Sequence, residues 1–418
     1  MNGTIENRLQ SKLTFLLLCM SLLAVPFNIV FFQIVRLSDL FFLVTVILYA
    51  TTNPKIKSAY LIIISLFYGS LFLSSLISIL HKNDIRFEGV VFYYKYSLLF
   101  LIPFVVNKVV DSRIRLKRIV SILYYIYLFL VVWVFVYYML RTNNILQGNT
   151  RVSYPFSDYF TNDSHVYSSY MSFTFVAYNE YIKKILSHGR IHSAILFVAS
   201  IIALLLTGSK TGIMILIVYS SIIIFRSIRS LRKKEINFLI SLLIIATILS
   251  FMLPNISNNE ALNKDIQSLY QRATTVNFED KSISNRKIYF LSAIAEIIPN
   301  LLLIGNGPTG ASKKWYDGGI SILLAHSGLL GVFVIINYIF LFIIKSRNMS
   351  IAVNMFDLYK IFVLLILTYT LLSVITEHFL ITRNILPAAT ILSIIYVNIR
   401  LNYFDYITIQ RHYKKAFN

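Results

Sequence analysis

Four basic residues with apolar or aromatic neighbours are the first candidates for chemistry: Arg151, Lys210, Arg272 and Arg286. A guanidinium group offers a planar fork that matches two phosphate oxygens, whereas a lysine ammonium acts as a compact point charge. If these groups gather outside a membrane, we expect them to bind a phosphate-bearing ligand. The alternative for each residue is a solvated charge on a loop.

Lys210 belongs to the turn at residues 207–212, Thr-Gly-Ser-Lys-Thr-Gly, which joins two apolar segments. The hydroxyls and backbone amides of such a turn can line an anion pocket. The turn is similar to the end of a nucleotide-binding P-loop, but the upstream glycine is missing and both flanks are predicted membrane helices. A nucleotide site is therefore excluded.

Asp317 is the candidate acid–base residue. It follows Trp315 and Tyr316 and precedes a long apolar run that contains Gly328-Leu-Leu-Gly331. A carboxylate at this boundary can orient or deprotonate a hydroxyl group, and the alternative is a favourable charge at a helix start. Just upstream, residues 305–310, Gly-Asn-Gly-Pro-Thr-Gly, predict a turn.

Further ionisable residues, Lys95, His326, Glu377 and His378, fall inside or at the ends of apolar runs. Such groups are functional candidates, although a hydrogen-bonded structural histidine is the commoner outcome. The seven histidines are scattered, and we expect none to share a helix face at His-x-x-x-His spacing. We predict no metal and no cofactor.

The elements that position these residues are membrane helices. Of the 418 residues, 57% are hydrophobic and 14% charged, and the mean hydropathy is +0.70, which excludes an ordinary soluble enzyme. The single cysteine, Cys19, excludes an internal disulfide. The sequence predicts an all-α polytopic bundle of about twelve spans in a single integral membrane domain, 1–418. The predicted spans are 13–32, 37–50, 59–80, 90–110, 119–140, 166–182, 194–206, 213–225, 236–254, 320–344, 361–376 and 385–399.

The net charge of +21 reflects topology rather than nucleic-acid binding. With both termini in the cytoplasm, most lysines and arginines fall in inner loops, as the orientation rule for short loops demands. Two outer segments are long, at residues 141–165 and 255–319, and loops of such length are commonly functional. The second contains an apolar stretch, 288–304, that is suited to an interfacial helix.

The order of these features resembles the bacterial O-antigen and capsular-polysaccharide polymerases, which are related to the O-antigen ligases. Four segments carry the resemblance: the run that begins Arg151-Val-Ser-Tyr-Pro-Phe, the Thr-Gly-Ser-Lys-Thr turn, Ser-Asn-Arg286 followed by Gly305-Asn-Gly, and Asp317 before Gly328-Leu-Leu-Gly. Lys210 stands where the family usually has arginine. Asp317 stands where ligase-like members often have histidine.

The resemblance implies a glycosyltransferase of the bacterial cytoplasmic (inner) membrane. Such enzymes transfer a growing glycan from polyprenyl diphosphate to the non-reducing end of a polyprenyl-diphosphate-linked repeat unit at the outer face. It implies membrane lipid as surroundings, and a chain-length regulator and a flippase as partners. Arg286, Arg151 and Lys210 would stabilise the diphosphate, Asp317 would act on the acceptor hydroxyl, and Arg272 would bind the lipid-linked sugar. Tyr154, Trp315 and Tyr316 would stack on sugars or anchor the interface.

Other functions remain open from the sequence. An O-antigen ligase would deliver glycan to lipid A core, and a flippase for lipid-linked oligosaccharide can also have about a dozen spans. Transporters usually contain repeated halves, and we find no internal repeat. A non-catalytic assembly protein would leave the outer cations unexplained.

Overall fold

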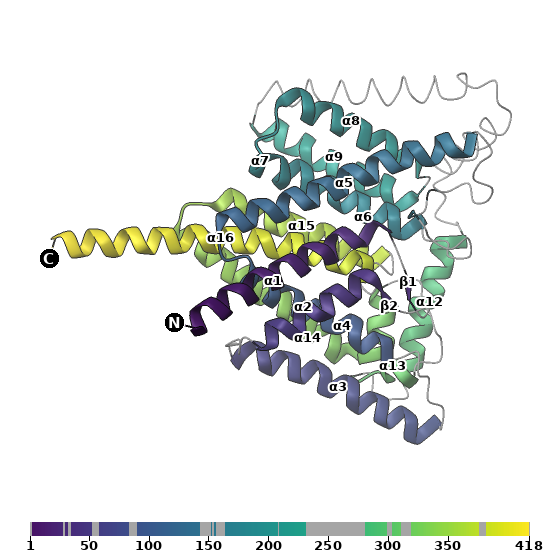
Figure 1. Cartoon of the computed structure of the whole chain (residues 1–418). Helices are drawn as coiled ribbons and strands as arrows, with labels where there is room; N and C mark the ends of the chain where they lie inside the picture. The colour runs from purple at the N-terminus through teal and green to yellow at the C-terminus, as the bar shows by residue number, and fades with distance from the viewer. Residues whose placement is uncertain are drawn as a thin grey trace. The chain divides into compact units, whose positions relative to one another are not determined.

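The computed structural model describes residues 2–27, 30–31, 35–51, 58–82, 90–142, 152, 154–155, 164–207, 209–230, 281–298, 303–310, 319–375 and 382–417. These residues are helical apart from turns and one two-residue antiparallel pair, β1 (Val30–Phe31) and β2 (Val35–Arg36) (Figure 1). The predicted helical class is confirmed.

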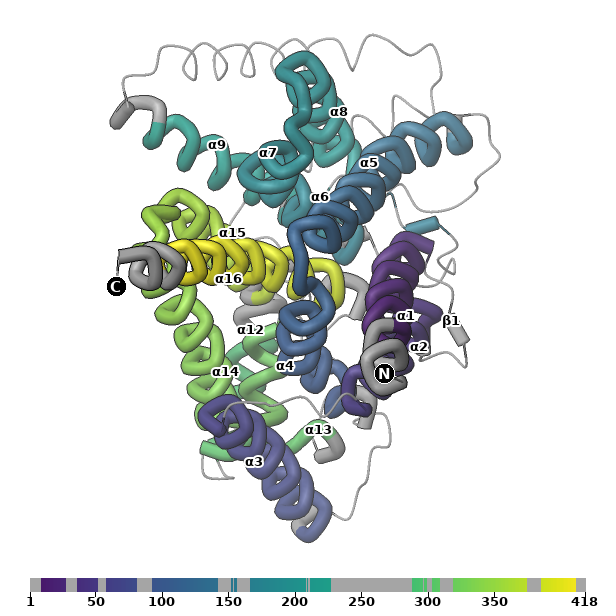
Figure 2. Tube along the Cα trace, turned by 60° about the vertical axis from the view of Figure 1, so that its left-hand side comes forward, coloured from purple at the N-terminus to yellow at the C-terminus, as the bar shows by residue number. Residues whose placement is uncertain are grey.

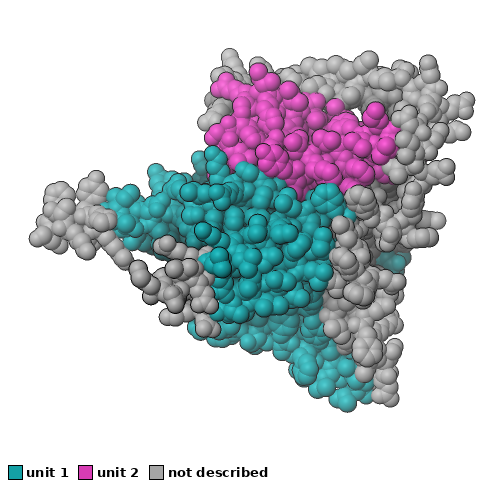
Figure 3. Space-filling view, viewed as in Figure 1, with its two compact units in different colours: residues 1–123, 281–418 teal, residues 124–280 magenta. Residues whose placement is uncertain are grey.

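The chain forms two compact units (Figure 3). Unit 1 comprises Met1–Leu123 and Lys281–Asn418, and unit 2 comprises Tyr124–Asp280. The expectation of a single integral membrane domain stays a prediction.

Unit 1 is built around α3, α4, α14 and α16: α14 packs on α3 and on α16, and α16 packs on α4 (Figure 2). Its centre is aromatic: Phe67 and Phe100 are almost fully buried, and Phe100 packs edge to face on Tyr338 with ring centroids 4.8 Å apart. Its elements are α1 (Asn2–Ala24), η1 (Val25–Phe27), α2 (Leu37–Thr51), α3 (Ser58–Lys82), α4 (Val90–Val109), the start of α5 (Arg113–Thr142), α12 (Lys281–Ile297), α13 (Gly307–Gly310), α14 (Gly319–Ala352), α15 (Phe356–Ile375) and α16 (Thr382–Phe417).

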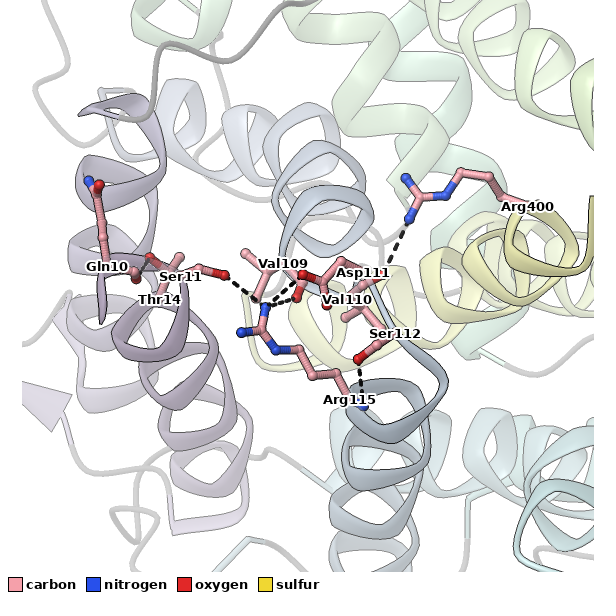
Figure 4. Close-up of polar contacts among 9 residues, drawn as sticks. All are labelled: Gln10, Ser11, Thr14, Val109, Val110, Asp111, Ser112, Arg115 and Arg400. Atoms are coloured by element: carbon pink, nitrogen blue, oxygen red, sulfur yellow. Dashed lines mark hydrogen bonds and ion pairs between the residues drawn. The ribbon is translucent and has the colours of Figure 1, made fainter. Parts of the chain in front are cut away.

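Arg115 and Arg400 bond the backbone of the connection between α4 and α5 (Figure 4). The Nη1 atom of Arg115 donates to the carbonyl oxygen of Val109 and to the hydroxyl of Ser11, both at 2.9 Å. Arg400 donates to the carbonyl oxygen of Val110 at 3.3 Å. Carbonyls at a helix C-terminus lack intrahelical donors, so these guanidinium groups satisfy the end of α4 and tie it to α1 and α16.

Unit 2 is centred on α6. Its elements are the rest of α5, α6 (Ser164–Ala177), a π-helical turn η3 (Tyr178–Ile182), α7 (Lys183–Ile185), α8 (Arg190–Leu206) and α9 (Lys210–Ser230). Residues 167–182 are buried without a break, with α8 and α9 packed on α6. A helix buried on all sides carries no solvent-facing or lipid-facing stripe.

Eleven of the twelve predicted spans overlap helices in the described part of the chain, and the span at 236–254 lies outside it. The first span, predicted at 13–32, extends too far, because α1 ends at Ala24 and Val30–Phe31 form a strand. Six of these helices are long and apolar enough to cross a membrane, and three shorter apolar helices accompany them. The total of twelve spans stays a prediction. The predicted interfacial helix at 288–304 is misplaced, because α12 ends at Ile297 and residues 303–306 form a turn.

Candidate functional site

The structure describes three of the predicted site residues. Lys210 is the first residue of α9, Arg286 lies in the second turn of α12, and Tyr154 is a buried residue ahead of α6. Arg151, Arg272, Trp315, Tyr316 and Asp317 lie outside the described residues. Lys210 and Tyr154 belong to unit 2 and Arg286 to unit 1, so their convergence on one cavity stays a prediction.

In unit 2 the segments that carry Arg151 and Lys210 are both anchored on α6. The ring of Tyr154 packs edge to face on Tyr167, with centroids 5.1 Å apart. The hydroxyl of Thr207 donates to the Oγ atom of Ser168 at 3.3 Å. Two motifs that are far apart in the sequence therefore contact neighbouring residues of one helix.

Gly212 lies where α9 approaches α6. A Cβ atom at this position would lie 2.7 Å from the Oγ atom of Ser168, so this hydroxyl, which bonds Thr207, would have to shift. The first backbone bond of α9 runs from the amide of Ile213 to the carbonyl of Ser209 at 3.2 Å, which places Ser209 at the helix N-cap. The turn that bears Lys210 therefore packs directly on α6 at Ser168.

Three buried hydroxyls on these segments have no hydrogen-bond partner among the described residues: Ser169, Tyr170 and Ser209. Buried polar groups are normally hydrogen-bonded, so each of these groups can still bind a ligand atom or a water. They were missed by sequence reasoning, because a serine or tyrosine within an apolar run has no distinguishing pattern. Tyr154 itself is only 1% exposed, and stacking of its ring on a sugar stays a prediction.

In unit 1 the Gly305–Gly307 turn docks on a kink in α14. The helix breaks at Gly328, where φ is 59° and ψ is −162°. The amide of Asn306 donates to the carbonyl of Ala325 at 2.8 Å, and the amide of Leu330 donates to the carbonyl of Leu303 at 2.9 Å. The turn therefore satisfies backbone groups that the kink releases from the helix.

Glycine is required on both sides of this contact. A Cβ atom on Gly328 would lie 2.5 Å from the carbonyl oxygen of Leu303, and one on Gly305 would lie 2.5 Å from the amide nitrogen of Gly328. Both residues also have positive φ, which L side chains rarely adopt. The structure thus brings together two glycine motifs that the sequence analysis treated separately.

His326 lies two residues before the kink at Gly328 and is 2% exposed. Its Nδ1 atom shares a hydrogen bond of 3.1 Å with the hydroxyl of Tyr96, and its ring packs edge to face on Phe92 at 4.6 Å. The ammonium of Lys95 lies 4.8 Å from the centroid of Phe92. The histidine is hydrogen-bonded, as is usual for such residues, and it stands beside a cation and the kink.

The hydroxyls of α3 complete this cluster. Ser74 donates to the carbonyl of His326 at 3.3 Å, and Ser75 shares a hydrogen bond of 2.7 Å with Tyr93. A Cβ atom on Gly307 would lie 2.2 Å from the Oγ atom of Ser75, so the turn is also pressed against α3. We refer to Ser74, Ser75, Lys95, Tyr96 and His326 as the kink cluster.

Unit 2 has a second polar cluster at the other end of α6. The carboxylate of Glu180 accepts hydrogen bonds from Tyr219 and Arg226, both at 3.0 Å, and it lies in the π-helical turn. Turns of this type are frequent at functional sites. The ion pair satisfies a carboxylate that is only 9% exposed.

His188 and His192 have His-x-x-x-His spacing, and their ring centroids lie 4.7 Å apart. His188 precedes α8 and only His192 lies on that helix, so the two do not share a helix face. Each ring bonds a tyrosine hydroxyl: His188 bonds Tyr178 at 3.2 Å and His192 bonds Tyr124 at 2.9 Å. Burial, together with the neighbouring His192, lowers the pKa of His188 below its usual value.

No family model and no curated protein matches the chain. The motif segments form two sets: one packs on α6 and the other packs on α14.

Proposed function

We propose that the chain is a polysaccharide polymerase. It would transfer a growing glycan from polyprenyl diphosphate to the non-reducing end of a lipid-linked oligosaccharide repeat unit, at the outer face of the bacterial cytoplasmic membrane. The resemblance of the motifs supports this function, and the helices that are apolar enough to cross a membrane are compatible with it.

The observation that carries the proposal is that separate motif segments contact or adjoin the same helix, α14. The Gly305–Gly307 turn seats on the kink at Gly328, and α12, which contains Arg286, packs on the same helix. Asp317 stands two residues before α14 in the chain. Two motif segments that are separated in sequence thus contact one helix, and a third precedes that helix in the chain, as expected if they act at one site.

Unit 2 supports the proposal in the same way. The segment around Arg151 and the turn that bears Lys210 are both anchored on α6, among buried hydroxyls without partners in the described part of the chain. Hydroxyls and a helix N-terminus are suitable donors for a phosphate group.

In the proposed reaction, the bond between the anomeric carbon of the glycan and the diphosphate oxygen breaks. A bond from that carbon to the acceptor hydroxyl oxygen forms. Arg286 and Arg151, assisted by Lys210, would neutralise the charge that accumulates on the leaving diphosphate, while Arg272 would hold the lipid-linked sugar. Asp317 would accept the proton of the acceptor hydroxyl or orient that hydroxyl, with the proton then passing to the diphosphate.

A reconstituted assay tests this function. Purified full-length protein in vesicles receives lipid-linked repeat units already on the outer face, with a chelator present. We expect a ladder of lengthened glycans, because polymerisation needs no transport and cationic side chains replace a metal in the proposed scheme. Transport of units across the bilayer without elongation would identify a flippase. Transfer only to lipid A core would identify a ligase.

A further inference from the structure

Exposed cations surround the connection between α4 and α5 in unit 1. Lys108 lies in the last turn of α4, Lys117 and Arg118 lie in the second turn of α5, and Lys12 lies on α1. All four side chains are exposed. We refer to Lys12, Lys108, Lys117 and Arg118 as the basic corner.

Side-chain contacts join the three helices at this point (Figure 4). Arg115 of α5 donates to the hydroxyl of Ser11, the neighbour of Lys12 on α1. It also donates to the carbonyl oxygen of Val109, the neighbour of Lys108 on α4. The basic corner therefore forms one surface, although its residues come from three helices.

The carboxylates near this surface already pair with other arginines. Asp111 pairs with Arg115 at 3.3 Å, and Asp405 of α16 pairs with Arg113 at 2.7 Å. None of the four side chains of the basic corner has an ion-pair or hydrogen-bond partner in the part of the chain that the structure describes. Their charges therefore remain available to an anion.

An apolar side chain lies among these cations. Ile114 is 67% exposed and stands four residues before Arg118, so both side chains occupy the same face of α5. The electrostatic neighbour of Arg118 is the thiol of Cys19 on α1, a group that is uncharged at neutral pH. The surface thus combines unneutralised positive charge with an exposed hydrocarbon group.

The length of α5 predicts where this surface lies in a bilayer. The helix is apolar enough to cross a membrane, and its 30 residues make it about 45 Å long at about 1.5 Å per residue. A bilayer with its headgroups is roughly 40–45 Å thick, whereas its hydrocarbon core is about 30 Å. If the predicted span 119–140 fills the core, the start of α5 lies among headgroups, where long basic side chains reach phosphates.

We infer that the basic corner binds an anionic phospholipid, with the phosphate against Lys117 and Arg118 and an acyl chain against Ile114. A zwitterionic lipid fits less well, because its ammonium group would be repelled by the clustered cations. Lipid is favoured over an acidic protein segment, because an acyl chain also covers the exposed Ile114. The site is independent of the proposed polymerase activity.

Native mass spectrometry of the full-length protein tests the inference, with phosphatidylglycerol and phosphatidylcholine titrated in parallel. We expect the wild type to retain phosphatidylglycerol preferentially. The double variant Lys117→Gln/Arg118→Gln should raise the apparent dissociation constant for phosphatidylglycerol about 25-fold, about fivefold for each basic residue removed from an anionic surface. The exchange Lys117→Arg/Arg118→Lys keeps both charges and should preserve binding.

Single variants separate this site from general surface charge. Arg118→Gln should weaken phosphatidylglycerol binding, whereas Arg347→Gln is the matched control, because Arg347 is exposed on α14 outside the basic corner. Ile114→Ser leaves the charge unchanged and should weaken the binding of both lipids. Equal losses from Arg118→Gln and Arg347→Gln would overturn the proposal. Displacement of the lipid by millimolar inorganic phosphate would identify the occupant as a free anion and would overturn it as well.

Discussion

At the scale of single residues, the glycine at position 328 determines the geometry of the candidate site in unit 1. Its backbone angles are accessible to glycine almost alone, and its Cα carries no atom that would strike the carbonyl of Leu303. The sequence indicated that the step Gly328-Leu-Leu-Gly331 was unusual. The kink itself could not be predicted, because it depends on backbone partners that lie more than twenty positions away in the chain.

Replacement of Gly328 measures how much the kink contributes to the stability of the protein. We expect Gly328→Ala to destabilise the protein by about 1–3 kcal/mol from backbone strain alone, with the steric clash adding to this. Thermal unfolding in detergent, followed by intrinsic fluorescence, should show the lower midpoint. Gly69→Ala is the matched control, because a Cβ atom on Gly69 of α3 would meet nothing within 4 Å. Equal midpoints for the two variants would contradict the role given to the kink.

At the scale of elements, α12 and α14 form one frame: α12 contains Arg286, and Asp317 precedes α14 by two residues in the chain. Both contain motifs that sequence reasoning identified, and the structure packs the two helices together. The hydrogen-bonding partners of the kink cluster were missed, since serine and tyrosine within apolar helices resemble ordinary packing residues. Their roles become visible only where the backbone of α14 opens and exposes carbonyls to them.

The proposed function predicts that substitutions at two neighbouring positions of α12 affect glycan elongation differently. Arg286 and Lys287 are adjacent, about 100° apart around the helix axis. If Arg286 stabilises the leaving diphosphate, Arg286→Ala should slow elongation about a hundredfold, as loss of one transition-state donor does. Lys287→Ala removes the same charge and should leave glycan length nearly normal. Both variants need comparable membrane levels, and similar elongation by the two would remove Arg286 from the mechanism.

At the scale of the whole molecule, hydropathy predicted where helices occur but not where they end. We predicted spans at 119–140 and 385–399, whereas α5 begins at Arg113 and α16 continues to Phe417. The extensions are polar and contact each other, since Arg113 bonds Asp405 at 2.7 Å and Asn402 at 2.8 Å. Hydropathy detects only the apolar part of a helix, so it does not detect polar extensions held by side-chain contacts.

The candidate site was predictable in part for a similar reason. Charge and glycine spacing identified the segments around Lys210, Gly305 and Gly328. The structure shows the hydrogen bonds that hold each segment in place. Spacing cannot show which helix receives a turn. The docking of two motifs on α6 and of others on α14 is a tertiary property that a single sequence does not encode in any local pattern.

The continuous burial of residues 167–182 also affects how the protein is made. This segment contains serine, threonine, asparagine and glutamate, which a translocon would not release readily into lipid. Its covering helices α8 and α9 are synthesised after it, so we expect α6 to integrate only once they have emerged. Glycosylation mapping of nascent chains truncated after α6 or after α9 would report this delay, and stable integration of the shorter chain would contradict it.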